Sequence, residues 1–366
     1  MTAYKRLFNH RPPQDSITLY RSPSTLSALD NLLVILGSLG VIGSVLWTPL
    51  LLKGIYNYWK RHISKENKTK RRIFASLLIA TAWICIVGPH RNPKVGEYLN
   101  FRHWRLWEAF VRYVSMEVRQ DSCSYEKNKI DIQNDKAILS VIPHGIFPFS
   151  LGLAALSDSI TKHAFCRFRP VVATATKFVP FLRMFLAWLD SVDAPKSSVH
   201  AALTSVNNNS SIGLSPGGIA EMFLAYPKPF THPNEEYALL SSRKGFIRLA
   251  LQHNLPIIPI YCFGSSQMFK QLNMFPNFFE KLSKWLRISF ILFYGRWGLP
   301  IPFRTKLLYV IGKPIFPNNN DNCLIDNVDD DYKVNDMHQR FCQEIQHIFD
   351  RHKESYGWAD KILKIV

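Results

Sequence analysis

A histidine stands at the point where a short apolar run ends, held between a proline and a glycine. The run covers residues 137–142, and Pro143-His144-Gly145 follows it directly. A neutral imidazole can take a proton from a hydroxyl near pH 7, so a histidine at the end of a buried strand is a candidate general base. Isolated histidines beside turns are also common structural features, and this triplet alone leaves both roles open.

A second turn that could take part in catalysis or binding is Ser215-Pro216-Gly217-Gly218. It ends another apolar run and is followed by Glu221. Glycines at such a turn let backbone amides approach a ligand or a developing oxyanion. Ligands of open α/β sheets bind just past strand ends, where both segments are expected to lie. A Pro-Gly-Gly turn by itself is more often only a turn.

A third cluster places two cations at the predicted start of a helix. Arg243 and Lys244 precede Gly245, and the helical pattern over 239–253 leads into another apolar run. Cations beside a helix N-terminus favour phosphate binding. A solvated charged face is the alternative for these two residues.

The elements that must position these residues follow an alternating pattern. Strand-like apolar runs cover 137–142, 170–175, 211–215, 255–262 and 306–311, and helical patterns cover 177–189, 195–206, 239–253 and 333–353. Strands separated by helices of this length predict an α/β fold with a mostly parallel sheet flanked by helices. Residues 317–331 are predicted to form an acidic surface loop.

The N-terminal quarter of the chain has a different character. Leu32 to Leu52 contains 21 residues without a charge, and a second apolar run covers Ile73 to Val87. The first run is long enough for a bilayer core, so the sequence predicts an N-terminal membrane helix or helical hairpin. The link between the runs is rich in Lys and Arg, as are both flanks, so the positive-inside rule does not settle the topology. Residues 98–114 mix aromatic residues with arginines at helical spacing and fit either a membrane interface or an ordinary packed helix, and 277–295 is similar.

Charge and cysteine content narrow the partners. The formal charge is +18, and residues 1–119 hold 18 Lys and Arg against 6 Asp and Glu. This excess accompanies the apolar runs, which favours a membrane surface and disfavours nucleic acid. The six cysteines form no C-x-x-C pair, so we expect reduced thiols and no metal site. The first 30 residues contain no signal-peptide pattern.

Taken in order, these motifs resemble the type-2 diacylglycerol acyltransferase family, which includes monoacylglycerol and wax-alcohol acyltransferases. Pro143-His144-Gly145 resembles its His-Pro-His-Gly box, and Pro216-Gly217-Gly218 with Glu221 is similar to its Pro-Gly-Gly-x-x-Glu box. The remaining matches are Pro180 and Arg183 in 176–185, Arg243-x-Gly245-Phe246, "YGRWGLPIP", "VIGKPI" and the closing segment 338–357. The resemblance covers about residues 137–357.

The chain departs from related patterns at three places. Ile142 stands where the family box has its first histidine, and Ser265-Ser266-Gln267 replaces an acidic-polar stretch. Related glycerolipid acyltransferases carry an aspartate five residues after the histidine, where this chain has Phe149. The partner of His144 must therefore come from elsewhere, and we hypothesise that Glu221 orients or charge-balances the imidazole.

The resemblance implies an acyl-CoA-dependent O-acyltransferase that makes triacylglycerol from diacylglycerol. Monoacylglycerol or a long-chain alcohol as acceptor, or a non-catalytic lipid-droplet scaffold, are the alternatives. In this interpretation His144 is the base, and amides near Gly145, Gly217 and Gly218 form the oxyanion hole. The acyl-CoA phosphates are assigned to Arg243, Lys244, Lys177 and Arg183.

The same resemblance implies where the protein works and how the chain is divided. Acyl-CoA is expected as co-substrate without a further cofactor, with membrane lipids as partners and self-association left open. The expected location is the endoplasmic reticulum membrane, with the lipid-droplet surface as a second site. The predicted divisions are an N-terminal tail (1–28), a membrane-embedded hairpin (29–90) and a catalytic domain (91–366).

Overall fold

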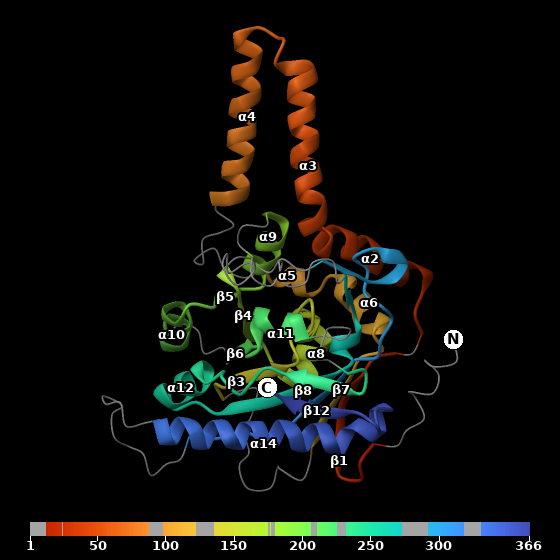
Figure 1. Cartoon of the computed structure of the whole chain (residues 1–366), viewed down its shortest axis with the longest axis vertical. Coiled ribbons are helices and arrows are strands. Elements are labelled where there is room, and N and C mark those ends of the chain that lie inside the picture. Colours follow the sequence, from red (N-terminus) through yellow and green to blue (C-terminus); the bar gives the residue numbers. More distant parts are fainter. Residues whose placement is uncertain are drawn as a thin grey trace.

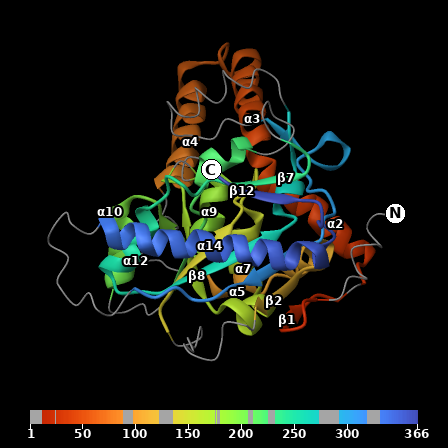
Figure 2. The same cartoon turned by 60° about the horizontal axis from the view of Figure 1, so that its bottom comes forward.

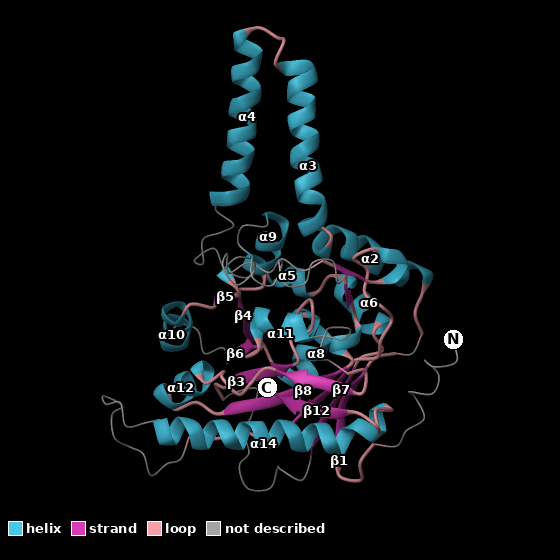
Figure 3. Ribbon diagram, viewed as in Figure 1, coloured by secondary structure: helices cyan, strands magenta, loops and turns pink. Residues whose placement is uncertain are grey.

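A mixed sheet flanked by helices forms the centre of the molecule (Figures 1 and 3). The computed structural model describes residues 12–23, 25–87, 98–121, 135–174, 176, 180–205, 211–224, 232–272, 292–317 and 331–366. Within these ranges eight strands pair in the order β1-β2-β11-β8-β3-β6-β4-β5. Their bounds are β1 Ser16–Arg21, β2 Glu117–Asp121, β3 Ile138–Ile142, β4 Phe168–Val172, β5 Val192–Asp193, β6 Ser211–Leu214, β8 Ile257–Phe263 and β11 Leu308–Ile311.

The predicted parallel sheet is confirmed in its central part. Strands β8, β3, β6, β4 and β5 are parallel, and all five strand-like runs of the sequence form strands. The last predicted strand, β11, runs antiparallel to β8 and parallel to β2. Strand β1 adds to β2 in antiparallel orientation, so part of the predicted N-terminal tail belongs to the sheet.

Both faces of the sheet are buried, and strand β3 shows how the sequence achieves this. Leu139 and Val141 belong to one hydrophobic cluster, while Ile138 and Ile142 belong to the other. Side chains alternate between faces along a strand, so a run that is apolar at all positions but Ser140 supplies both layers. Helices α6 (Arg105–Tyr113) and α7 (Phe149–Leu156) pack on the first face.

The second face is covered by α10 (Lys196–Thr204), α12 (Gly245–Gln252) and the long α14 (Asp331–Tyr356). Figure 2 shows α14 crossing the sheet along its length. These three helices and α9 (Pro180–Trp188) correspond to the four predicted ones. Helix α12 begins later than predicted because Ser241 and Ser242 form a turn, and Lys244 occupies the N-cap position without a side-chain capping bond.

The aromatic and basic segment 98–114 forms an ordinary packed element. It contains α5 (Leu99–Arg102) and α6, and the apolar positions Phe101, Trp107, Val111 and Val114 are buried. These four positions therefore pack against the domain, whereas Trp104 is 38% exposed and Leu99 is 54% exposed, so contact of the segment with a membrane interface stays a prediction. Most of 277–295 and of 317–331 lies outside the described residues.

The uncharged run beginning at Leu32 divides into two parts. Helix α2 (Ala28–Gly37) packs on α6, and its buried Asp30 accepts from Arg112 Nε at 3.1 Å. A π-helical turn at Ser38–Ile42 follows, where the chain leaves the domain to form α3 (Ser44–Tyr58). Figure 1 shows α3 and α4 (Lys68–Val87) projecting side by side.

The two projecting helices, which we call the hairpin, expose apolar side chains. Leu50 is 68% exposed, Ile79 is 67% exposed and Trp83 is 63% exposed. Among the described helices, none combines the length and the apolar composition of a membrane span. The predicted membrane helix is thus not confirmed, and residues 88–90 at the end of the predicted hairpin (29–90) lie outside the described part.

Candidate active site

The candidate site lies where three neighbouring parallel strands end. Strand β3 lies between β8 and β6, with Ile142 paired to Tyr261 and Ser140 paired to Leu214. Because parallel strands present their carboxyl ends at one edge, the loops after β8, β3 and β6 meet there. These loops carry Ser265, His144 and the Pro216-Gly217-Gly218 turn. The two motifs identified in the sequence therefore converge, as expected.

His144 and Glu221 meet through the main chain of the histidine. Glu221 closes the short helix α11 (Gly218–Glu221), and its Oε2 accepts the backbone N–H of His144 at 2.7 Å. Its Oε1 accepts the backbone N–H of Leu239 at 3.1 Å, just after β7 (Glu235–Ala238). The carboxylate thus ties two loops together. This contact differs from the hypothesis that Glu221 orients or charge-balances the imidazole, because the carboxylate bonds to the backbone N–H of His144.

The His144 ring has its own local partner. Its Nδ1 lies 2.8 Å from the carbonyl oxygen of Gly145. A carbonyl can only accept, so Nδ1 carries the proton and Nε2 keeps its lone pair. Burial lowers the pKa of His144, against a smaller opposing effect of the Gly145 carbonyl. The geometry therefore presents a neutral imidazole whose Nε2 can act as a base.

The buried carboxyl group of Glu221 is a weaker acid than an exposed glutamate. Burial raises its pKa to about 7, although the amides of His144 and Leu239 and the positive charge of Arg243 act in the opposite direction. Two neutral donors and a nearby guanidinium do not offset the loss of water around the carboxylate. A pKa of about 7 puts the midpoint of this titration near neutral pH, on a carboxyl group that contacts the His144 backbone.

Three glycines of the site occupy positions that disfavour a Cβ atom, through backbone conformation or lack of space. Gly145 has φ +69°, and a Cβ there would lie 3.1 Å from the Ser265 hydroxyl oxygen. A Cβ on Gly217 would lie 2.5 Å from the Glu221 carboxyl carbon. Gly218 has φ +53°, and its N–H donates to the Ser215 carbonyl at 3.1 Å. Since that amide closes a turn, Gly145 and Gly217 are the better candidates for an oxyanion hole.

Hydroxyl groups that we did not select from the sequence brace the two loops. Ser150 Oγ donates to the Pro143 carbonyl at 3.1 Å, and Ser215 Oγ donates to the Val141 carbonyl at 2.8 Å. Ser265 Oγ lies 3.4 Å from the same Pro143 oxygen. The strand-end rule could have selected Ser265, which follows β8 as His144 follows β3. Nothing in the sequence signals that the Leu239 amide reaches Glu221.

The four predicted phosphate-binding cations lie in different environments. Arg243 acts electrostatically on Glu221, and its buried Nε has no hydrogen-bond partner among the described residues. Lys244 Nζ donates to Asn335 Oδ1 of α14 at 2.7 Å. Arg183 is buried on α9, which packs against α4 at the base of the hairpin. Lys177 lies outside the described residues. Of the three described cations, only Arg243 is recorded as acting on Glu221.

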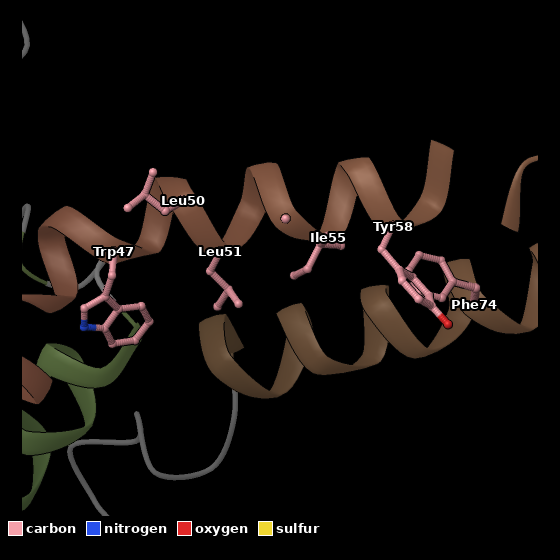
Figure 4. A pocket seen from close by; sticks show the side chains of 7 residues that line it. Trp47, Leu50, Leu51, Ile55, Tyr58 and Phe74 are labelled. Atoms are coloured by element: carbon pink, nitrogen blue, oxygen red, sulfur yellow. The ribbon is translucent and has the colours of Figure 1, made fainter. Parts of the chain in front are cut away.

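A separate apolar groove lies on the hairpin. It has a volume of about 600 Å³ and is lined by Trp47, Leu50, Leu51, Gly54, Ile55, Tyr58 and Phe74. In Figure 4 Trp47, Leu51 and Ile55 point from α3 toward α4, and Tyr58 lies beside Phe74. The groove could accept hydrocarbon but belongs to the hairpin, not to the His144 loop. Within the described ranges no three His, Cys, Asp or Glu side chains are arranged to hold a metal.

Comparison with known proteins gives consistent results. A family model described as diacylglycerol acyltransferase matches residues 69–365. Human acyl-CoA wax alcohol acyltransferase 2 is 28% identical over 74% of this chain and 80% of its own length. Bovine 2-acylglycerol O-acyltransferase 1 is 26% identical over 74% and 78%, and human diacylglycerol O-acyltransferase 2 is 26% identical over 74% and 69%.

A solved structure also overlaps the chain, at low similarity. The 1-acyl-sn-glycerophosphate acyltransferase of Thermotoga maritima covers 87% of this chain with 97% of its own, at a TM-score of 0.37 and 12% identity. These values are too low to support conclusions about the site.

Proposed function

The chain belongs to the diacylglycerol acyltransferase family, and we propose that it transfers an acyl group from acyl-CoA to the hydroxyl of diacylglycerol, forming triacylglycerol. The observation that carries the proposal is the state of the His144 ring. Its Nδ1 proton is held by the Gly145 carbonyl at 2.8 Å, which leaves Nε2 as the acceptor. An ester-forming acyltransferase needs such a base at a position that a hydroxyl can reach.

The reaction follows from this arrangement. His144 Nε2 takes the proton of the acceptor hydroxyl while the hydroxyl oxygen attacks the thioester carbonyl carbon. The tetrahedral oxyanion is stabilised by backbone amides, with Gly145 and Gly217 as the proposed donors. The carbon–sulfur bond then breaks, and the imidazolium returns its proton to the leaving thiolate as coenzyme A departs. No step of this scheme uses a cofactor.

Glu221 serves this reaction as a positioning residue. Its carboxylate bonds to the His144 amide at 2.7 Å and to the Leu239 amide at 3.1 Å. These bonds hold the loop after β3 against the Pro-Gly-Gly turn, so that the proposed base and amides keep their relative places. The role proposed here acts through the backbone, without proton relay from the imidazole.

The acyl-CoA head group is assigned to the cationic side of the site. Arg243 lies near Glu221 and Lys244 stands at the start of α12, so both are placed near the strand ends. Arginine matches the geometry of phosphate oxygens with paired N–H donors. Lys177 and Arg183 remain weaker candidates for the same group.

The lipid substrate gives the hairpin a purpose. Diacylglycerol is confined to membranes, and the hairpin exposes Leu50, Ile79 and Trp83. Its outer end carries Lys60, Arg61, Lys65, Lys68, Lys70, Arg71 and Arg72. We propose that the hairpin embeds the enzyme in the endoplasmic reticulum membrane, with the lipid-droplet surface as a second location.

The acceptor has a second candidate class. Two similar proteins are named for wax alcohol and for 2-acylglycerol acyl transfer, and both are about as similar to this chain as diacylglycerol O-acyltransferase 2. A long-chain alcohol or monoacylglycerol presents the same hydroxyl to the base. Acceptor choice is therefore the point that the experiment must decide.

The test uses microsomes from cells that lack their own neutral-lipid synthesis. Labelled acyl-CoA is supplied with diacylglycerol, monoacylglycerol or a fatty alcohol, and wild type is compared with His144→Ala at equal membrane abundance. We expect triacylglycerol from wild type and a loss of about 10²- to 10⁴-fold in the variant. Unchanged turnover in His144→Ala would remove the proposed base. Absence of product with every acceptor would favour a lipid-droplet scaffold without catalysis.

A further inference from the structure

A second pocket lies away from the strand ends, between α2 and the segment that follows β10 (Phe293–Tyr294). Its volume is about 560 Å³, and its lining residues are Asn31, Ile35, Arg296, Trp297, Phe303 and Arg304. Two arginines, one amide and two aromatic rings line the same pocket, a combination that could bind an anionic group attached to an apolar one. Guanidinium groups bind phosphate oxygens, and aromatic rings suit a boundary between polar and apolar surroundings.

Arg296 is held in place before any ligand arrives. Its Nη1 donates to the Tyr113 hydroxyl at 3.2 Å, and Tyr113 in turn donates to the Pro302 carbonyl at 2.8 Å. The guanidinium also lies over the Trp297 ring, 4.3 Å from the centroid. A planar guanidinium fixed by stacking loses less conformational entropy when it binds an anion.

Trp297 is presented outward at a cost in backbone strain. Its φ is +58°, a conformation that bulky residues rarely adopt, and its side chain is 66% exposed. The adjacent Gly298 has φ +74°, and Leu299 is 43% exposed. Strained backbone that exposes a large apolar side chain is typical of binding segments. Moving the exposed indole ring from water into an apolar layer would be favourable, and this gain would offset the backbone strain.

Helix α2 continues this surface with a row of leucines. Leu29, Leu32 and Leu36 are 47%, 50% and 57% exposed, and their spacing puts them on one side of the helix. The opposite side packs on the domain through Val34 and Asp30, whose carboxylate is paired with Arg112 and Arg105. That acid is therefore already paired, and the residues that line the pocket include two arginines and no carboxylate.

The position of the pocket points to a membrane surface. Figure 1 shows α2 along the edge of the domain from which α3 and α4 project, with the light-blue segment after β10 beside it. The α2 surface, defined as Leu29, Leu32, Leu36, Trp297 and Leu299, thus lies at the base of the hairpin. A bilayer entered by the hairpin would meet these side chains at headgroup depth.

We propose that this pocket binds the phosphate of an anionic phospholipid through Arg296 and Arg304, while the α2 surface enters the interfacial layer. The inference rests on the membrane attachment given as part of the proposed function. It adds a specific lipid contact on elements other than the hairpin and the strand ends. Tryptophan and arginine side chains at headgroup level stabilise such contacts, and anionic lipids attract the cations.

The experiment measures binding of soluble short-chain lipids to the purified full-length protein in detergent. The probes are dihexanoylphosphatidylserine, dihexanoylphosphatidylcholine, inorganic phosphate and adenosine 3′,5′-bisphosphate. The variant is Arg296→Gln/Arg304→Gln. The control, Arg248→Gln/Arg340→Gln, removes the same charge from α12 and α14, where both arginines pair with surface acids.

We expect wild type to bind the serine lipid more tightly than the choline lipid or phosphate. The pocket variant should lose roughly 10- to 30-fold in affinity, and the control less than about twofold. Arg304→Gln alone keeps the Arg296–Tyr113 bond and should show part of the loss, and the melting temperature of each variant is measured beside its affinity to separate lost binding from lost folding. Equal losses in the two double variants would overturn the proposal.

Two further outcomes separate this inference from its premise. Displacement of the lipid by adenosine 3′,5′-bisphosphate at equal concentration would reassign the pocket to the acyl donor and overturn the lipid contact. Acyl transfer is measured on the same preparations, and His144→Ala should lose turnover while keeping lipid affinity. If wild type binds the serine lipid selectively but acylates no acceptor, the lipid contact stands and the proposed enzymatic function fails.

Discussion

Two buried glutamates show how the same side chain can be placed for opposite purposes. Glu117 on β2 is 2% exposed, and Glu221 at the strand-end site is 4% exposed. Burial raises the pKa of either carboxyl group, because water no longer solvates the charge. The neighbours then decide the outcome, and they differ completely between the two positions.

Cations surround Glu117. Arg119 Nε lies 2.7 Å from its Oε1, Lys306 Nζ lies 2.9 Å from its Oε2, and Arg21 adds a third contact at 3.0 Å. Burial would raise the pKa of Glu117, but Lys306 and Arg119 outweigh it and lower the pKa to about 2. Glu117 therefore stays ionised, and its ion pairs connect β2 with Arg21 of β1 and with Lys306, which lies two residues before β11.

Backbone amides surround Glu221, and its pKa rises to about 7. Amides favour the carboxylate less than full charges do, so the side chain remains close to its protonation midpoint at neutral pH. Glu117 thus belongs to an ionic cluster of fixed charge, whereas Glu221 lies in a site where the carboxyl group can change its charge near neutral pH. Strongly raised carboxyl pKa values in such places are typical of functional sites.

The largest effect on stability is predicted for Glu117→Gln. The substitution leaves Lys306 and Arg119 buried with one compensating charge removed, which should lower the free energy of unfolding by about 3–5 kcal/mol. Acyl transfer per folded molecule should be unchanged. Thermal unfolding in detergent measures the loss, and the control is Glu66→Gln, an exposed residue that pairs with Lys70, at under about 1 kcal/mol. A loss equal to that of the control would mean that Glu117 is not the centre of the cluster.

The next effect is a pH dependence carried by Glu221. Its folded pKa of about 7 exceeds the ordinary value of 4.5, so its contribution to stability is complete below pH 4.5 and is lost as pH rises through 7. Glutamine does not titrate. Between pH 5 and 8 wild type should therefore lose on the order of 3 kcal/mol relative to Glu221→Gln. Unfolding measured across this range provides the test.

The same titration of Glu117→Gln must give the opposite sign. The folded pKa of Glu117 is about 2, so its contribution is complete above pH 4.5 and is lost as pH falls toward 2. The deficit of Glu117→Gln should shrink on acidification, whereas that of Glu221→Gln should not. Parallel curves for the two variants would contradict the distinction between the two environments.

The sequence predicts the strand-end site around His144 and Glu221 far better than it predicts the ionic cluster around Glu117. The largely apolar β3, β6 and β8 could be identified because buried parallel strands have a nearly continuous apolar pattern, and the motifs that follow β3 and β6 carry His144 and Glu221. Strand β2 reads "EVRQD", a polar sequence that no apolar pattern selects. It is buried because its charges pair with residues more than 90 positions away, such as Arg21 and Lys306.

Local contacts within the site were also beyond sequence reasoning. The spacing of motifs cannot show whether a carboxylate reaches a histidine ring or its amide, because this depends on the turn between Gly217 and Glu221. Glu221 in fact bonds to the amide. Likewise, a charge-free run from Leu32 to Leu52 does not reveal that α2 packs on the domain through Asp30, just before that run.

A smaller effect is expected from Gly217→Ala. The new Cβ would lie 2.5 Å from the Glu221 carboxyl carbon, so the carboxylate must move away from the His144 amide. The free energy of unfolding should fall by about 1–3 kcal/mol. Acyl transfer should fall by more than this loss of folded protein accounts for. Gly152→Ala in α7, where a Cβ meets nothing within 4 Å, is the matched control and should be neutral or stabilising.

The smallest effect comes from single hydroxyl groups, and it tests the comparison most directly. Ser215 Oγ donates to the Val141 carbonyl at 2.8 Å, which ties the Pro-Gly-Gly turn to the end of β3. Ser355 Oγ accepts from Arg119 at 3.0 Å in the Glu117 cluster. Ser215→Ala should cost about 1 kcal/mol, and Ser355→Ala up to about 2 kcal/mol because its partner is charged.

The two serine variants should rank in the opposite order when acyl transfer is measured in place of stability. The Ser215 bond lies between the loop of the proposed base and the loop of Glu221, so its loss lets them separate and should lower acyl transfer severalfold. The Ser355 bond lies within the ionic cluster, and Ser355→Ala should keep wild-type turnover per folded molecule. If both variants lost turnover in proportion to stability alone, catalysis would depend on the rigidity of the whole sheet. The hydrogen bond from Ser215 to Val141 would then have no specific role in acyl transfer.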